Sequence, residues 1–221
     1  MQYASVVFDF DSTVVNTETF ELLAEEALKE VSNREETLNA FQAITNQGMA
    51  GEIPLEESFR RRMALVSLSK KHIDAIVPHM IERLSPSFSR NLDFFEKHGK
   101  RCFIVSGGFI DLIYPVSDYL GIAREHVHAN QFVFDASGKV IGLDTTRPTC
   151  RAGGKALQIR ALNLEQPSVM IGDGMTDYEA KHQGGVTTFI AYTEFARREK
   201  VCALSDKCAG SLDEVRELLR H

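Results

Sequence analysis

The sequence predicts an α/β fold, a doubly wound, Rossmann-like parallel sheet core with an inserted helical cap domain and a small β-hairpin. Three observations predict it. Short apolar runs without polar alternation recur along the chain, as expected for strands buried on both faces of a parallel sheet. Patterns of helical period separate these runs, and alternating strand and helix is the signature of this fold class. The chain from 16 to 85 carries only helical patterns, which is too long for a simple crossover.

The strands are expected where the apolar runs lie. The first run, Ala4–Phe8, is rich in valine and phenylalanine and leads at once into acidic residues. Three further runs end in small or polar residues: Cys102–Val105, Val169–Ile171 and Thr188–Ala191. Ligands bind beyond the carboxyl ends of the strands in doubly wound sheets. The residues that follow these runs are therefore the candidate functional residues.

Helices are expected between the strands, and the longer insertion is expected to be a separate domain. The helical patterns outside the insertion are Asn91–His98, Phe109–Leu120, Lys155–Leu162, Asp177–Gln183 and Leu212–Leu219. We expect residues 1–15 and 86–221 to form the core and residues 16–85 to form a helical cap above the carboxyl edge of the sheet. Phe132–Phe134 and Val140–Leu143, joined by a turn at Asp135–Gly138, predict an antiparallel hairpin.

Composition and charge exclude several classes of function. A formal net charge of -6 argues against a protein that neutralises nucleic-acid phosphates or coats an anionic membrane. Apolar runs of the length needed to span a bilayer, about 18 residues, are absent from the sequence. The four cysteines form no CxxC pair and the N-terminus has no secretory pattern, so we expect reduced thiols and a cytoplasmic location. A monomer and a homodimer both remain open.

Two carboxylates follow the first strand. Period-two geometry is expected to place Asp9 and Asp11 on one side of the chain, facing one point at the sheet edge. Close carboxylates repel unless a cation lies between them or one is protonated. With a divalent metal, one aspartate can attack a phosphoryl group while the other passes a proton to the leaving oxygen. The alternative is an acidic turn in which Asp11 or Ser12 caps a helix.

A second acidic cluster follows the run Val169–Ile171. The glycines of Gly172-Asp173-Gly174 allow a tight turn that leaves Asp173 and Asp177 at the same sheet edge as Asp9. Hard oxygen ligands in this number suit Mg²⁺. The alternative is a glycine-rich turn followed by a helix that Thr176 or Asp177 caps.

Two further motifs could hold a phosphate. Ser106-Gly107-Gly108 offers a hydroxyl and backbone N–H groups near an expected helix start. Lys155, after two glycines, could neutralise phosphate charge, although most lysines are simply solvated. The GxxxxGK[ST] pattern of a nucleotide-binding P-loop is absent.

These four motifs stand in one order along nearly the whole chain: DFDST at 9–13, SGG at 106–108, Lys155 and GDGxTD at 172–177. Together they resemble the haloacid-dehalogenase superfamily of phosphatases. Within it the chain is most similar to the phosphoserine phosphatases, for which Ser12, the SGGF stretch at 106–109 and the stretch from Pro148 to Lys155 that ends in GGK are typical. The helical insertion matches the cap of that family.

The resemblance implies a role for each motif. Asp9 would be the nucleophile that forms a phosphoaspartyl intermediate, and Asp11 would protonate the leaving alkoxide and then activate water. Asp9, the Asp11 carbonyl oxygen and Asp173 would hold Mg²⁺, with Asp177 orienting a metal-bound water. Ser106, Gly107 and Lys155 would bind the transferring phosphoryl group.

The resemblance also implies the substrate, a small phosphorylated metabolite that we expect to be O-phospho-L-serine, and its recognition residues. Glu18 occupies the place of a glutamate that meets the substrate ammonium, and Arg62 aligns with the arginine that binds its carboxylate. Met49, Gly108 and Thr176 are also expected to line the substrate site. The alternatives are a first-turn helix glutamate for Glu18, a solvated basic face for Arg62 and a core position for Met49.

One segment departs from that family. Many phosphoserine phosphatases carry a glycine-glycine-asparagine turn after the strand that ends near Ala191, whereas this chain has Tyr192–Arg198. Glu194 or Arg197 could therefore contact a different substrate.

Two alternative functions remain open. One is a phosphatase or phosphotransferase with the same machinery and another phosphorylated metabolite, and the other is a non-enzymatic aspartyl-phosphate switch of the response-regulator type. The inserted cap and Asp11 disfavour the switch.

Overall fold

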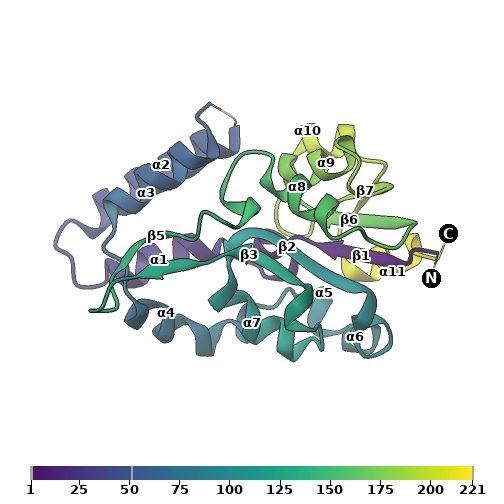
Figure 1. The fold of residues 1–221 in the computed structure, drawn as a ribbon, viewed down its shortest axis with the longest axis horizontal. Helices are drawn as coiled ribbons and strands as arrows, with labels where there is room; N and C mark the ends of the chain where they lie inside the picture. The colour runs from purple at the N-terminus through teal and green to yellow at the C-terminus, as the bar shows by residue number, and fades with distance from the viewer. Residues whose placement is uncertain (1, 51, 221) are drawn as a thin grey trace.

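The computed structural model describes residues 2–50 and 52–220, with the side chains of residues 49 and 50 outside the described part. Its main sheet has six strands in the order β3-β2-β1-β6-β7-β8, and every neighbouring pair is parallel (Figure 1). The strands in sheet order are β3 (Val127–Asn130), β2 (Cys102–Phe109), β1 (Ser5–Phe8), β6 (Ser168–Gly172), β7 (Thr188–Tyr192) and β8 (Lys207–Ala209). The predicted α/β fold with a parallel core is confirmed.

β1 lies inside the sheet between β2 and β6, and every one of its four residues is buried. Phe8 is in register with Ile104 of β2 on one side and Ile171 of β6 on the other. The residues that follow these positions therefore lie at neighbouring points, which brings the three sequence motifs to one edge of the sheet. This register is what makes a shared site possible.

Helices cover both faces of the sheet (Figure 1). Side chains alternate along β1, so Val6 and Phe8 enter one apolar cluster and Val7 enters the other. The cluster around Phe8 includes residues of α5 (Pro86–Ser89), α6 (Leu92–His98), α7 (Ile110–Tyr119) and α11 (Leu212–Leu218). The cluster around Val7 includes residues of α8 (Gly154–Ala161), α9 (Met175–His182) and α10 (Glu199–Leu204).

The described part of residues 16–85 consists mainly of helices, as the sequence predicts. The segment contains α1 (Thr19–Ala27), α2 (Arg34–Ala50), α3 (Leu55–Leu65), α4 (Lys70–Ile76) and short 3₁₀ turns at Val77–His79 and Ile81–Arg83. Its two ends lie side by side, because the Asn16 N–H donates to the Arg83 carbonyl and the Ser85 N–H donates to the Val14 carbonyl, each at 2.9 Å. α2 and α3 pack together and extend away from the sheet (Figure 1).

Aromatic side chains join this segment to the sheet. The Phe20 ring of α1 lies 5.0 Å from Phe41 of α2, 5.2 Å from Phe59 of α3 and 5.3 Å from Phe109 of β2, measured between ring centroids. The inserted helices and the core therefore share buried apolar surface, which holds α1 and α3 next to the end of β2.

The predicted hairpin is confirmed as β4 (Phe132–Phe134) paired with β5 (Val140–Leu143) in antiparallel register. Two edge strands were not predicted. β3 and β8 are short, and the sequence Lys207-Cys208-Ala209 has no apolar run, so their pairing depends on neighbours distant in the sequence. The strand expected at Cys102–Val105 is longer than predicted, because Ser106–Gly108 continue the extended chain of β2. None of the helices in residues 2–50 and 52–220 is long and apolar enough to cross a membrane.

Candidate active site

The chain turns sharply directly after β1, within the segment that carries Asp9 and Asp11. Asp9 Oδ1 accepts a hydrogen bond from the Phe10 N–H at 2.7 Å. The turn over residues 10–14 places Ser12 at a φ of +53°, and the Val15 N–H closes it on the Phe10 carbonyl at 3.1 Å. The strand ends at Phe8, before the expected period-two geometry can apply to Asp9 and Asp11, so this turn sets where Asp11 lies. The charge of Asp9 still contributes to the raised pKa of Asp11, so the two carboxyl groups lie near each other.

The carboxylate of Asp11 is held by the first residue of α1. Asp11 Oδ2 accepts a hydrogen bond from the Thr19 hydroxyl at 3.1 Å, and Oδ1 accepts one from the Thr19 N–H at 3.2 Å. Burial, followed by the charges of Glu18 and Asp9, raises the pKa of Asp11 well above its ordinary value, while the two Thr19 hydrogen bonds oppose that rise. A carboxyl group with a raised pKa is suited to donate a proton.

Lys155, at the start of α8, bridges the ends of two strands. Its Nζ lies 2.9 Å from Asp9 Oδ1 and 2.6 Å from Asp177 Oδ1. Burial alone would lower the pKa of this lysine, but the charges of Asp177 and Asp9 raise it above its ordinary value. Lys155 is therefore a charged group at the point where β1 and β6 end, and it is too buried to be a solvated surface lysine.

Asp173 directly follows β6, and Asp177 lies in the first turn of α9. Asp177 is fully buried, and its Oδ2 accepts a hydrogen bond from the Gly174 N–H at 2.9 Å. A Cβ at Gly172 would lie 2.3 Å from Asp177 Cγ, so this position has room only for glycine. Burial, followed by the charge of Asp9, raises the pKa of Asp173 to about 6 and that of Asp177 well above its ordinary value.

The oxygen atoms of Asp9, Asp173 and Asp177 fit a metal ion. One carboxylate oxygen from each residue lies within 4.8 Å of the others, and all three side chains are buried. Among the described residues, the cations that contact these carboxylates are Lys155 and Arg198, which leaves one negative charge in excess. Repulsion among the carboxylates contributes to the raised pKa values of Asp173 and Asp177, and a divalent cation would offset it. The Asp11 carboxylate accepts a hydrogen bond from Thr19 and is not part of this group of three carboxylates.

The end of β2 places Ser106 and Gly108 beside Asp11. Ser106 Oγ accepts a hydrogen bond from the Gly108 N–H at 2.9 Å, and a Cβ at Gly108 would lie 3.2 Å from Asp11 Oδ2. Gly107 is exposed, and its carbonyl accepts a hydrogen bond from Asn130 Nδ2 at 2.7 Å. Thr149 in turn donates to Asn130 Oδ1 at 2.9 Å. Asn130 thus holds the end of β2, a role that no motif in the sequence indicated.

Glu18 and Arg62 approach from the inserted helices. Glu18 is half-buried, and its Oε1 accepts a hydrogen bond from the Ser12 hydroxyl at 2.7 Å. Burial raises the pKa of Glu18. Burial also lowers the pKa of Arg62, although the nearby charges of Glu18, Glu21 and Asp11 act to raise it. The Arg62 guanidinium carbon lies 4.7 Å from the centroid of the Phe20 ring. Arg62 is therefore a half-buried cation near the carboxylates, which does not fit a solvated basic face.

The remaining predicted residues are less informative. Thr176 is exposed in the first turn of α9, directly after the Asp173 turn. The side chain of Met49 lies outside the described residues. Glu194 accepts hydrogen bonds from Ser87 and Tyr192, and Arg197 pairs with Glu199 at 2.8 Å on the surface. In that loop it is Arg198, which the sequence analysis did not single out, that contacts the carboxylate cluster.

Known proteins resemble this chain in sequence and in fold. The model of the haloacid dehalogenase-like hydrolase family matches residues 6–181. The chloroplastic phosphoserine phosphatase of Arabidopsis thaliana is 37% identical over 208 residues, which cover 91% of this chain and 67% of that protein. The phosphoserine phosphatase of Homo sapiens is 30% identical over 179 residues, which cover 80% of this chain and 76% of that protein.

A solved structure extends the likeness over the whole length. The crystal structure of a phosphoserine phosphohydrolase-like protein from Francisella tularensis subsp. tularensis SCHU S4 superposes with a TM-score of 0.86 at 32% identity, and the match covers 97% of this chain and 98% of that one. The chain therefore belongs to the haloacid dehalogenase-like hydrolases and, among their phosphatases, to the phosphoserine phosphatase family.

Proposed function

We propose that this protein is a Mg²⁺-dependent phosphatase that hydrolyses O-phospho-L-serine to L-serine and phosphate. The observation that carries the proposal is the buried Lys155 ammonium between Asp9 and Asp177, with Asp173 beside them at the ends of β1 and β6. The names of the Arabidopsis and human relatives support the substrate.

In the first step, a carboxylate oxygen of Asp9 attacks phosphorus and the bond between phosphorus and the serine oxygen breaks. The Phe10 N–H and Lys155 both donate to Asp9 Oδ1, so they orient the nucleophile. Asp11 donates its proton to the departing alkoxide, for which its raised pKa is suited. The products of this step are L-serine and an aspartyl phosphate on Asp9.

In the second step, a water molecule attacks the phosphorus of the aspartyl phosphate. Asp11, now ionised, accepts the proton from this water, and the phosphorus–oxygen bond to Asp9 breaks to release phosphate. Lys155, the Ser106 hydroxyl and backbone N–H groups at the end of β2 bind the phosphoryl oxygens in both steps. Mg²⁺, held by Asp9, the Asp11 carbonyl and Asp173 with Asp177 acting through water, would offset phosphoryl charge when bound.

The substrate's other two charges would be met by residues on α1 and α3. Glu18 pairs with the ammonium group, and Arg62 binds the carboxylate with two donors. The charge of Glu18 acts on Arg62, so the two side chains are near enough to contact opposite charges of the same small substrate. Gly108 and Thr176 complete the substrate site, with Met49 from the end of α2. Residues 16–85 act as a cap that excludes bulk water, and residues 1–15 and 86–221 form the catalytic core. We place the enzyme in serine biosynthesis in the cytoplasm.

The test is the release of inorganic phosphate with Mg²⁺ from O-phospho-L-serine and from a panel of other phosphorylated metabolites. The Asp9→Asn variant serves as the blank, and a chelator removes the metal. We expect phosphoserine to be preferred and the preference to be lost in Arg62→Ala and Glu18→Gln. Activity confined to another ester would refute the substrate and leave the mechanism in place. A phosphorylated acceptor alcohol in place of free phosphate would identify a phosphotransferase.

A further inference from the structure

Arg198 is a cation of the site that the reaction scheme above does not use. Its Nε lies 3.0 Å and its Nη2 lies 2.9 Å from Oδ2 of Asp173. Asp173 is buried, whereas the Arg198 side chain is about one third exposed at 35%. The guanidinium therefore reaches inward from the surface to one carboxylate of the cluster.

The backbone of Arg198 is fixed by the helix that follows it. The Arg198 carbonyl accepts hydrogen bonds from the N–H groups of Val201 at 2.9 Å and Cys202 at 3.0 Å, which form the first turn of α10. Val201 is buried against the face of the sheet that α8 and α9 cover. The position from which the Arg198 side chain extends is thus set by packed structure.

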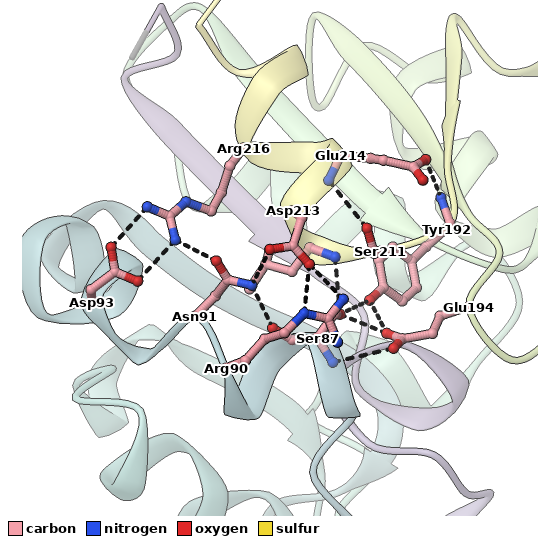
Figure 2. A network of polar contacts seen from close by, with 12 residues as sticks. Ser87, Arg90, Asn91, Asp93, Tyr192, Glu194, Ser211, Asp213, Glu214 and Arg216 are labelled. Atoms are coloured by element: carbon pink, nitrogen blue, oxygen red, sulfur yellow. Dashed lines mark hydrogen bonds and ion pairs between the residues drawn. The ribbon is translucent and has the colours of Figure 1, made fainter.

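The other end of the same loop is anchored by Glu194. Its Oε2 accepts hydrogen bonds from the Ser87 hydroxyl at 2.6 Å and from the Tyr192 hydroxyl at 2.5 Å. Figure 2 shows these three side chains pointing toward one another next to the start of α11. The Leu212 N–H also donates to Ser87 Oγ, at 2.9 Å. The loop at 193–198 is therefore held at both ends.

The neighbouring Arg197 differs from Arg198 in its exposure and in its ion-pair partner. Arg197 has a side chain that is 60% exposed, and its ion pair is with Glu199 on the surface. The two arginines share a loop and a charge, but only Arg198 is in contact with a residue of the carboxylate cluster among the contacts described for them. Arg197 is therefore a matched control for the charge of the loop.

We propose that Arg198 is a positioning residue that holds the Asp173 carboxylate in the orientation required of a metal ligand. The inference rests on the proposed function only in taking Asp173 as a ligand of a divalent cation. A carboxylate has two oxygens and can serve an arginine and a metal together. Partners that orient ligand carboxylates in this way contribute to metal affinity, and removing one typically weakens binding by about 10- to 100-fold.

The test is calorimetric titration of the metal-free full-length protein with Mg²⁺, comparing wild type with Arg198→Ala, Arg198→Lys and Arg197→Ala. We expect the dissociation constant to rise about 10-fold or more in Arg198→Ala. Arg198→Lys should restore part of the affinity, because an ammonium supplies the charge without two donors in a fixed plane. Arg197→Ala should bind Mg²⁺ as wild type does.

Thermal unfolding separates positioning from a loss of fold. In the presence of a chelator, Arg198→Ala and Arg197→Ala should each unfold in a single cooperative transition, as wild type does. Added Mg²⁺ should raise the unfolding temperature less in Arg198→Ala than in the other proteins. Unchanged Mg²⁺ affinity in Arg198→Ala would overturn the proposal. Tighter binding would overturn it as well and identify Arg198 as a competitor of the cation.

Failure of the proposed substrate gives a different result. If Arg198→Ala loses Mg²⁺ affinity while the wild-type protein does not hydrolyse phosphoserine, the role of Arg198 stands and the substrate is refuted. If the wild-type protein binds no Mg²⁺ at millimolar concentration, both the metal in the proposed function and the role of Arg198 are refuted.

Discussion

Thr19 holds both oxygens of the Asp11 carboxylate, through its hydroxyl at 3.1 Å and through its backbone N–H at 3.2 Å. Thr19 is fully buried and begins α1, so the inserted helices orient the group that we propose as general acid. The place at which α1 packs therefore determines how the carboxyl group of Asp11 is oriented for proton transfer.

Replacing the Thr19 hydroxyl should slow turnover selectively for substrates with poor leaving groups. We expect Thr19→Val to lower kcat for an alkyl phosphate about 10-fold, a part of the 10²- to 10⁴-fold that a positioned acid contributes. Thr19→Ser retains the hydroxyl and should stay near wild type. The loss should be smaller with p-nitrophenyl phosphate, whose leaving group needs no proton. Equal losses with both substrates in Thr19→Val would contradict a role in positioning Asp11.

Removing the buried ammonium between Asp9 and Asp177 should abolish most activity. We expect Lys155→Met to lower kcat/KM at least 100-fold, because two buried carboxylates lose their shared cation and the phosphoryl group loses a positive partner. Lys70→Met is the control, since Lys70 is exposed and pairs with Asp74 on the surface. Steady-state phosphate release measures both variants. Comparable activity in the two would show that Lys155 has no part in the reaction.

Shortening Asn130 should weaken the hold on the phosphate-binding end of β2. Asn130→Ala removes the donor to the Gly107 carbonyl and the acceptor of the Thr149 hydroxyl, both buried or half-buried contacts. We expect KM for the phosphorylated substrate to rise about 10-fold, in keeping with the loss of the hydrogen bond that holds the Gly107 carbonyl. Inhibition by inorganic phosphate should weaken in parallel. Asn46→Ala, on the exposed surface of α2, should change neither quantity.

A single methyl group at Gly172 should displace Asp177. In Gly172→Ala the new Cβ would lie 2.3 Å from Asp177 Oδ2, and a misplacement of about 1 Å at a catalytic site can cost 10²-fold in rate. We therefore expect activity and Mg²⁺ affinity to fall together. Gly142→Ala is the matched control in β5, where a Cβ meets nothing within 4 Å. Retention of both properties in Gly172→Ala would mean that Asp177 is dispensable or free to move.

Most strands and helices of the core could be predicted from the sequence, because short stretches of neighbouring residues carry the patterns that predict them. The apolar runs before Asp9, Ser106 and Asp173 predict three strands. The structure makes these strands neighbours, with Phe8 in register with Ile104 and Ile171. The helical spacing of apolar residues predicts the helices of residues 16–85, and the turn residues at 135–138 predict the hairpin. Short edge strands such as β3 and β8 carry no comparable pattern, since sheet neighbours distant in the chain determine whether they pair.

The sequence by itself determined the doubly wound frame, the three aspartates of the cluster and the lysine, because each lies next to a buried strand or at a helix start. The tertiary structure decided which donors hold those groups. Thr19 reaches Asp11 from an inserted helix, Asn130 reaches Gly107 from an adjacent strand, and Arg198 reaches Asp173 across 25 positions. Contacts of this kind depend on where helices and loops pack above the sheet edge, and that packing comes from burial summed over the whole chain, which no single motif encodes.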